Sequence, residues 1–493
     1  MVDRAHEVNR TPSWKYALLL LLSLSGLPAA WGASPASDKL PAPIAAALKR
    51  NGLSPRGLSL YVQEIGRAQP LLAVSADTPR HPASTIKILT TVAALEELGP
   101  AYRWKTEFYA TSPVRDGRLD GDLYLKGYGD PYLVIENFWL FLRALRAQGL
   151  DTIIGDLVMD QSYFAREPGD RGEFDNQPLR AYNVLPNALL VNFQAVNFRF
   201  VPQPGVGRLN IIADPLPANI EVENRVKLTQ GSCRGWWARG LGLQVRRHNK
   251  DATQVVFSGT YDAACGENGL YRVVSEPAPY LLGLFRTMWS ELGGRFRGNV
   301  REGTVPDGAQ LLYTGYSPPL ADIIRSINKF SNNVMARQLL LTLGAERDGP
   351  PGTTEKGTVV VDEWLRQRGL DFPELVLDNG AGLSRETAIS ARHLGQVLLA
   401  AWRGPYMSEF VSSLPISAMD GTLRKRFSHA AELEGQMHLK TGSLNDVRSL
   451  AGYVQDRAGR RWVVVCLHNG PRADTAAGEA VQDALLKWVY ERP

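Results

Sequence analysis

One short motif in this 493-residue chain places a serine and a lysine where they can cooperate in nucleophilic chemistry. Ser84-Thr-Ile-Lys87 stands at the predicted start of a helix, so its two polar side chains lie on one helical face. A serine hydroxyl is a weak nucleophile until a base takes its proton, and a lysine amine does so when burial keeps it neutral. The motif therefore predicts covalent catalysis at Ser84 with Lys87 as the base.

The same pattern occurs a second time, so it does not identify the nucleophile by itself. Ser326-Ile-Asn-Lys329 also matches, and average residue usage yields roughly one or two such matches in a chain of this length. Ser84 follows two predicted strands and opens a helix, whereas Ser326 lies inside a continuous helical pattern over residues 323–343. Context favours Ser84.

Two further motifs offer groups that acyl transfer needs. Ser331-Asn-Asn333 supplies a hydroxyl that can relay a proton and an amide that can hold a peptide carbonyl, although alone it also fits a polar helix cap. Lys440-Thr-Gly442 lies in a strand-like segment, where the lysine and threonine can bind a carboxylate and the glycine permits close approach of a substrate. Together the three motifs are typical of penicillin-binding proteins and class A β-lactamases.

The elements that must position these motifs follow from the apolar periodicity. Helices are predicted at 41–51, 82–98, 280–289, 323–343 and 480–488, and strands at 58–65, 70–75, 450–455 and 461–467. The last two strands flank Asp-Arg-Ala-Gly-Arg, which is typical of a hairpin. The pattern predicts an α/β catalytic domain built from residues 34–101 and 276–493, interrupted by a β-rich insertion at 102–275 of one or two domains.

Composition and charge exclude several classes of protein. The chain is 44% hydrophobic and 21% charged, which is ordinary globular usage. Its net charge of +5 comes from scattered basic residues, so we expect no nucleic-acid partner. Without a Cys-x-x-Cys or clustered His pattern we expect neither a metal site nor a cofactor.

The N-terminal residues 1–33 have the pattern of a secretion signal. Arg10 and Lys15 precede an apolar run over residues 16–27, and small residues follow, with cleavage expected near Gly32 or Ala33. The run is too short to span a bilayer comfortably. We therefore expect export to the periplasm and at most peripheral association with the membrane.

Three cysteines are consistent with such an oxidising compartment. Cys233 and Cys265 can close a loop within a strand-rich region, although the sequence leaves their pairing open. Cys466 lies in the apolar run Trp462-Val-Val-Val-Cys-Leu467 and is predicted to be a buried free thiol.

With these motifs in place, the sequence resembles the class C low-molecular-mass penicillin-binding proteins, D-alanyl-D-alanine carboxypeptidase/endopeptidases of the penicillin-binding protein 4 type. The resemblance covers nearly the whole mature chain, and flanking segments favour Ser331 over Ser326. Those segments are His81-Pro-Ala-Ser-Thr-Ile-Lys87, Gly127-Tyr-Gly-Asp-Pro131, Asn328-Lys-Phe-Ser-Asn-Asn333, Asn379-Gly-Ala-Gly-Leu-Ser-Arg385 and Met419-Asp-Gly-Thr-Leu423. Two departures are Tyr128 in a usually glycine-rich run and Ala381 where serine is more usual.

The resemblance implies a role for each matching residue. Ser84 is the acylated nucleophile and Lys87 its base, while Ser331 and Asn333 relay a proton and anchor the substrate. Lys440 and Thr441 are implied to bind the terminal carboxylate of the substrate, and the N–H groups of Ser84 and Ser443 to form the oxyanion hole. Asp175 is implied to contact the amino-bearing side chain of the peptide.

The same resemblance implies the fold and the ligands. We expect a penicillin-binding, transpeptidase-like (β-lactamase-like) domain with a central antiparallel sheet and helices, interrupted by two nested β-rich domains. The implied substrates are peptidoglycan stem peptides, and the implied covalent inhibitors are β-lactam antibiotics.

Two alternatives remain open at this point. A β-lactamase would deacylate penicillin rapidly, but the long stretch between Ser84 and Ser331 exceeds what a β-lactamase core needs. A non-catalytic peptidoglycan-binding protein on the same fold is disfavoured by four intact motif residues, which are Lys87, Ser331, Asn333 and Lys440.

Overall fold

The computed structural model describes residues 37–233, 235–247 and 252–492. The predicted signal segment at 1–33 lies outside the described residues. Within the described ranges, no helix has both the length and the apolar character needed to cross a membrane.

A five-stranded antiparallel sheet joins the two ends of the chain. Its order is β18-β19-β20-β1-β2. The strands are Met437–Leu444, Val447–Gln455, Arg461–Asn469, Leu58–Glu64 and Leu72–Val74. The predicted C-terminal hairpin is confirmed as β19 and β20, and the two N-terminal strands complete the sheet.

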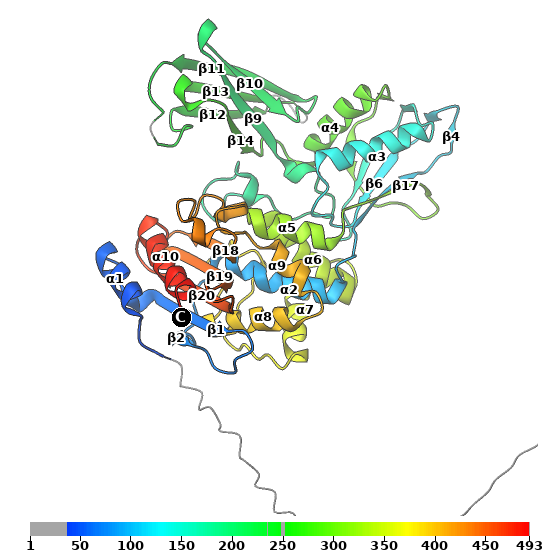
Figure 1. Cartoon of the computed structure of the whole chain (residues 1–493). Helices are drawn as coiled ribbons and strands as arrows, with labels where there is room; N and C mark the ends of the chain where they lie inside the picture. The colour runs from blue at the N-terminus through cyan, green and yellow to red at the C-terminus, as the bar shows by residue number, and fades with distance from the viewer. Residues whose placement is uncertain (1–36, 234, 248–251, 493) are drawn as a thin grey trace, which may run out of the picture. The chain divides into compact units, whose positions relative to one another are not determined.

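Helices cover both faces of this sheet (Figure 1). On one face lie α1 (Ala42–Asn51) and α10 (Ala476–Tyr490), and on the other lie α2 (Lys87–Leu98) and α8 (Ala391–Arg403). Val464 and Cys466 of β20 face the first core, whereas Val463 and Val465 face the second, because successive strand residues point to opposite sides. Burial on both faces explains the continuous apolar run, and the prediction that Cys466 is a buried free thiol is confirmed.

The remaining helices of this part of the chain include a break that the sequence pattern did not reveal. They are α5 (Leu320–Phe330), α6 (Asn333–Asp348), α7 (Thr354–Gln367) and α9 (Met407–Ser413). The predicted continuous helix over 323–343 is wrong, because Ser331 takes a left-handed conformation with φ 57° and ends α5. Asn332 then caps α6, its side chain accepting a hydrogen bond from Met335 N.

The insertion is built from small sheets and two helices, α3 (Ile135–Ala147) and α4 (Pro277–Glu291). Two sheets have the orders β16-β8-β6-β3-β17 and β15-β7-β5-β4, and two three-stranded sheets have the orders β10-β9-β14 and β11-β13-β12. The strands are β3 (Lys105–Ala110), β4 (Val114–Arg115), β5 (Arg118–Leu119), β6 (Leu123–Gly127), β7 (Thr152–Ile153), β8 (Leu157–Asp160), β9 (Val196–Gln203), β10 (Arg208–Asp214), β11 (Ile220–Thr229), β12 (Leu241–Arg247), β13 (Thr253–Asp262), β14 (Asn268–Arg272), β15 (Arg295–Phe296), β16 (Val300–Glu302) and β17 (Gln310–Tyr316).

Strand pairing and core packing support a later end for the insertion than the predicted boundary at 275. Strand β17 pairs antiparallel with β3, and β16 pairs parallel with β8. Phe285 and Trp289 of α4 share a hydrophobic core with Phe141 of α3. Residues 277–316 therefore pack with the insertion instead of the catalytic domain, and we propose 102–316 as its extent. The two three-stranded sheets come from residues 196–272, between strands of the larger sheets, which supports the nested arrangement.

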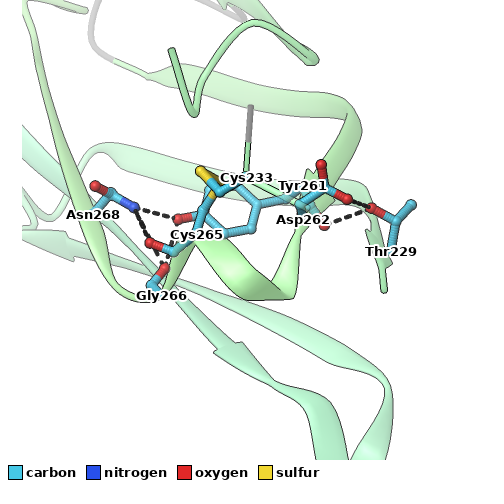
Figure 2. Close-up of a disulfide and its surroundings, with 7 residues drawn as sticks. All are labelled: Thr229, Cys233, Tyr261, Asp262, Cys265, Gly266 and Asn268. Atoms are coloured by element: carbon cyan, nitrogen blue, oxygen red, sulfur yellow. Dashed lines mark hydrogen bonds between the residues drawn. A yellow bond between two sulfur atoms is a disulfide. The ribbon is translucent and has the colours of Figure 1, made fainter. Parts of the chain in front are cut away.

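Cys233 and Cys265 form a disulfide within the insertion (Figure 2). Beside it the Tyr261 hydroxyl donates to Gly266 O at 2.7 Å, and Asn268 Nδ2 donates to the Tyr261 oxygen at 2.8 Å. The bridge thus ties the segment after β11 to the turn between β13 and β14, and settles the pairing that the sequence left open.

Candidate active site

Ser84 and Lys87 lie in one turn at the start of α2. Residues Ala83–Ile86 form a short 3-10 helix that continues into α2 at Lys87. The Lys87 amine lies 3.0 Å from Ser84 Oγ. Strand β18 packs closely against this turn, because a Cβ on Gly442 would lie only 2.7 Å from Ser84 N. Glycine at this position is therefore what allows the strand to approach the serine.

Lys87 is fully buried among uncharged acceptors. Its amine donates to Asn333 Oδ1 at 2.6 Å and to Ala381 O at 2.5 Å, so the lone pair of a neutral amine is left for the Ser84 hydroxyl. Burial, assisted by the charge of Lys440, lowers the pKa of Lys87 well below its usual value. This environment favours the neutral amine, which is the form that can take a proton from the serine.

The break between α5 and α6 directs two polar side chains into the same site. Ser331, at the end of α5, accepts a 2.8 Å hydrogen bond from the Lys440 amine. Asn333, the first residue of α6, accepts the bond from Lys87. Lys440 is fully buried on β18 and also donates to Thr441 O at 2.7 Å, and burial lowers its pKa to about 7. Three segments far apart in sequence thus converge around Ser84.

A cavity of about 1220 Å³ opens over these groups. Its lining includes Ser84, Ser331, Asn333 and Ser443. Thr441 lies on the same strand as Lys440, and its hydroxyl donates to Thr422 Oγ1 at 2.8 Å. Ser443, further along β18, is exposed and lines the same cavity.

Asp175 lines the same cavity but already has several partners. Its carboxylate accepts hydrogen bonds from the Tyr182 hydroxyl at 2.6 Å and from Asn183 Nδ2 at 2.8 Å. The Arg180 guanidinium lies 3.8 Å away. Burial acts to raise the pKa of Asp175, but these hydrogen bonds outweigh it and hold the pKa below its usual value. The carboxylate is therefore anionic and fixed in direction.

The competing Ser326 and Lys329 do not form a nucleophile and base pair. The Lys329 amine donates to Asp420 Oδ2 at 2.6 Å and to Leu414 O at 2.9 Å. These partners are a carbonyl and a carboxylate on other segments, and the Ser326 hydroxyl is not one of them. The structure thus separates the two matching motifs by their surroundings.

Some contacts of the site could not be predicted from side-chain types in the sequence. The acceptor at Ala381 is a backbone carbonyl, so the departure from serine leaves the bond to Lys87 intact. Gly382 follows with φ 74°, and a Cβ there would lie 2.1 Å from Ala83 O. Ser449 Oγ donates to Pro82 O at 2.5 Å and so ties β19 to the turn that holds Ser84. In the sequence, only the resemblance of the segment from Asn379 to Arg385 to the family indicated that residues 381 and 382 belong to the site.

Comparison with known proteins identifies the family. A model of the D-Ala-D-Ala carboxypeptidase 3 (S13) family matches residues 40–492. The chain belongs to this family. The D-alanyl-D-alanine carboxypeptidase of Actinomadura sp. (strain R39) is 32% identical over 426 residues, which cover 83% of this chain and 77% of that one. D-alanyl-D-alanine carboxypeptidase DacB of Haemophilus influenzae is 26% identical over 414 residues, covering 84% and 85%.

The fold agrees with a solved structure of the same kind. The crystal structure of penicillin binding protein 4 from Haemophilus influenzae matches with a TM-score of 0.74 and 25% identity, covering 91% of this chain and 99% of that one. The predicted penicillin-binding fold is confirmed. As an S13 member with these relatives, the protein is a penicillin-binding, serine-type D-Ala-D-Ala carboxypeptidase.

Proposed function

We propose that this S13 carboxypeptidase forms its acyl-enzyme on Ser84, with Lys87 as the base. The observation that supports this most is the fully buried Lys87 amine, which contacts Ser84 Oγ at 3.0 Å and otherwise only uncharged oxygens among its hydrogen-bond partners in the described residues. A desolvated neutral amine in contact with a hydroxyl is the arrangement that activates serine without histidine.

The reaction then proceeds as a two-step acyl transfer. Lys87 takes the Ser84 proton while Oγ attacks the carbonyl carbon of the penultimate D-alanine, and the N–H groups of Ser84 and Ser443 stabilise the oxyanion. The C–N bond breaks, and a proton passes through Ser331 Oγ to the leaving amine. Water hydrolyses the serine ester, which restores the hydroxyl and releases the shortened peptide.

Substrate orientation is assigned to the groups around this serine. The protonated Lys440 and the Thr441 hydroxyl hold the terminal carboxylate, while the Asn333 amide holds a peptide carbonyl. Asp175 contacts the amino-bearing side chain of the stem peptide, since its fixed carboxylate lines the same cavity. Replacing Asp175 with Asn is expected to raise KM for a peptide with a free side-chain amine more than for its acetylated form, and equal KM values would count against this contact.

The ligands and the compartment follow from this function. We propose peptidoglycan stem peptides as substrates, β-lactam antibiotics as covalent inhibitors, and export to the periplasm directed by residues 1–33. A structure of the Haemophilus influenzae protein complexed with a β-lactam has a TM-score of 0.71 to this chain, which supports a shared fold. The scheme requires no cofactor.

Labelling with a fluorescent penicillin tests the assignment of the nucleophile. Wild-type protein and the matched control Ser326→Ala are expected to become labelled, whereas Ser84→Ala is expected to remain unlabelled. Labelling of Ser84→Ala would show that another residue is acylated. Rapid turnover of nitrocefin by the wild type would instead favour a β-lactamase.

A second assay separates the two cell-wall reactions. The protein is incubated with a monomeric pentapeptide and with a cross-linked peptide dimer, and the products are weighed by mass spectrometry. Loss of D-alanine from the monomer defines carboxypeptidase activity, and cleavage of the dimer defines endopeptidase activity. Peptidoglycan binding without either product would support a non-catalytic role.

A further inference from the structure

Four large aromatic side chains remain exposed around the cavity that contains Ser84. They are Tyr182 (36% exposed), Trp236 (56%), Tyr271 (60%) and Phe330 (72%). Isolated exposed hydrophobic residues are normal on a protein surface, but several at one cavity mark a binding surface. We call these four side chains the aromatic rim.

Trp236 is kept exposed by anchors on both sides of it in the chain. The disulfide at Cys233 fixes the chain ahead of it (Figure 2). Immediately after it, the Trp237 ring packs against Phe200 and Tyr261 with centroid distances of 5.4 Å and 5.9 Å. The chain is thus anchored on both sides of Trp236, whose indole is exposed at the cavity.

Polar groups with defined positions lie beside the rings. The Tyr182 hydroxyl donates to Asp175 Oδ2 at 2.6 Å, which orients its ring. Tyr271 is followed on β14 by Arg272, which also lines the cavity. Flat apolar faces with donors and acceptors at their edges complement a pyranose ring, which has C–H faces and a periphery of hydroxyl groups.

We infer that the aromatic rim binds sugar rings of the glycan strand to which the stem peptide is attached. This inference rests on the proposed function, because a peptide whose free end lies at Ser84 leads along the same cavity toward its attachment sugar. The cavity volume of about 1220 Å³ exceeds the roughly 300–1,000 Å³ of a typical small-molecule site, which leaves room for more than a peptide tail. Arg180 and Arg272 also line the cavity, where their guanidinium groups can donate hydrogen bonds to sugar hydroxyls.

Paired substrates measure the contribution of the sugar. D-Alanine release is compared for a free pentapeptide and for the same pentapeptide on an N-acetylglucosaminyl-N-acetylmuramyl disaccharide. The disaccharide is expected to raise wild-type kcat/KM roughly three- to tenfold, as expected for one or two ring contacts. In Trp236→Ala and in Tyr271→Ala, the ratio of kcat/KM with the disaccharide to kcat/KM without it is expected to fall to about one. Tyr316→Ala is the matched control, because Tyr316 is 57% exposed on β17 outside the cavity lining, and it should keep the ratio.

A wild-type ratio near one, or a ratio that survives both rim substitutions, would overturn the inference. If neither peptide is hydrolysed, the proposed function fails, and sugar binding is judged separately by calorimetry with a peptide-free tetrasaccharide of the same alternating sugars. In that case, tetrasaccharide binding to the wild type that is absent in Trp236→Ala supports sugar binding at the aromatic rim. No tetrasaccharide binding to the wild type rejects it. Self-association in sedimentation that Trp236→Ala abolishes would assign the surface to a second copy instead, which also rejects it.

Discussion

The Lys440 amine donates a 2.8 Å hydrogen bond to Ser331 Oγ, which joins strand β18 to the break between α5 and α6. Its other acceptor, Thr441 O at 2.7 Å, is also uncharged. Because burial deprives the ammonium of water, the pKa of Lys440 falls to about 7. The site therefore contains a cation that loses its charge within the range of ordinary assays.

We expect kcat/KM for a pentapeptide to fall as pH rises through about 7, since kcat/KM reports the ionisations of the free enzyme. Below this pKa Lys440 is protonated and attracts the terminal carboxylate, and above it the amine is neutral. Arginine stays charged throughout, so Lys440→Arg should move the alkaline limb to higher pH even if the maximal rate falls. The pH profile of both proteins measures this, and an alkaline limb that is the same in both would contradict the role of Lys440.

Gly442→Ala is expected to slow acylation by a fluorescent penicillin about 100-fold. The added Cβ would lie 2.3 Å from Ser449 Oγ and 2.7 Å from Ser84 N, so β18 must move away from the nucleophile. Gly470→Ala is the matched control, because a Cβ there meets nothing within 4 Å. Stopped-flow labelling measures both rates, and equal rates for the two variants would show that β18 does not set the position of Ser84.

Local features of the fold could be predicted from the sequence because short-range patterns determine them. The pair Ser84 and Lys87 share a turn, and β19 and β20 are joined by a short loop, so their contacts depend on neighbouring residues. The convergence of Lys87 with Asn333 and of Lys440 with Ser331 joins distant segments. Only the family resemblance of the motifs suggested it.

Other features left no local pattern to follow. Apolar periodicity continues on both sides of Ser331, so the periodicity could not predict the left-handed break between α5 and α6. The carbonyl at Ala381 is a group that every residue has. The later end that we propose for the insertion depends on β17 pairing with β3, which lies near the insertion's start. Long-range pairing of this kind is set by tertiary packing.

Asp420→Asn is expected to lower the free energy of unfolding by about 1–3 kcal/mol, because it leaves the Lys329 charge without its carboxylate partner. The Lys329 side chain is only 8% exposed, whereas that of Asp420 is 38% exposed, which limits the loss. The control is Asp120→Asn in the exposed pair of Arg118 and Asp120, which should lower the free energy of unfolding by at most about 0.5 kcal/mol. Native-state hydrogen exchange compares the two, in α5 for Asp420→Asn and in β5 for Asp120→Asn, and equal losses of protection would show that burial of Lys329 has no energetic consequence.

Removing the disulfide by Cys233→Ala together with Cys265→Ala should destabilise the insertion locally. The two cysteines are 32 residues apart in sequence, and closing a loop of that size stabilises a fold by about 3–4 kcal/mol through the entropy of the unfolded chain. Hydrogen exchange is the suitable measurement, because a chain of several domains does not unfold in one step. Exchange should accelerate in β12, β13 and β14 but not in β19 and β20, which belong to another core. Penicillin acylation serves as the internal control, and a fall in acylation together with the loss of protection would show that the catalytic domain also depends on the disulfide. Unchanged exchange in β13 would show that the bridge adds nothing to the stability of this sheet.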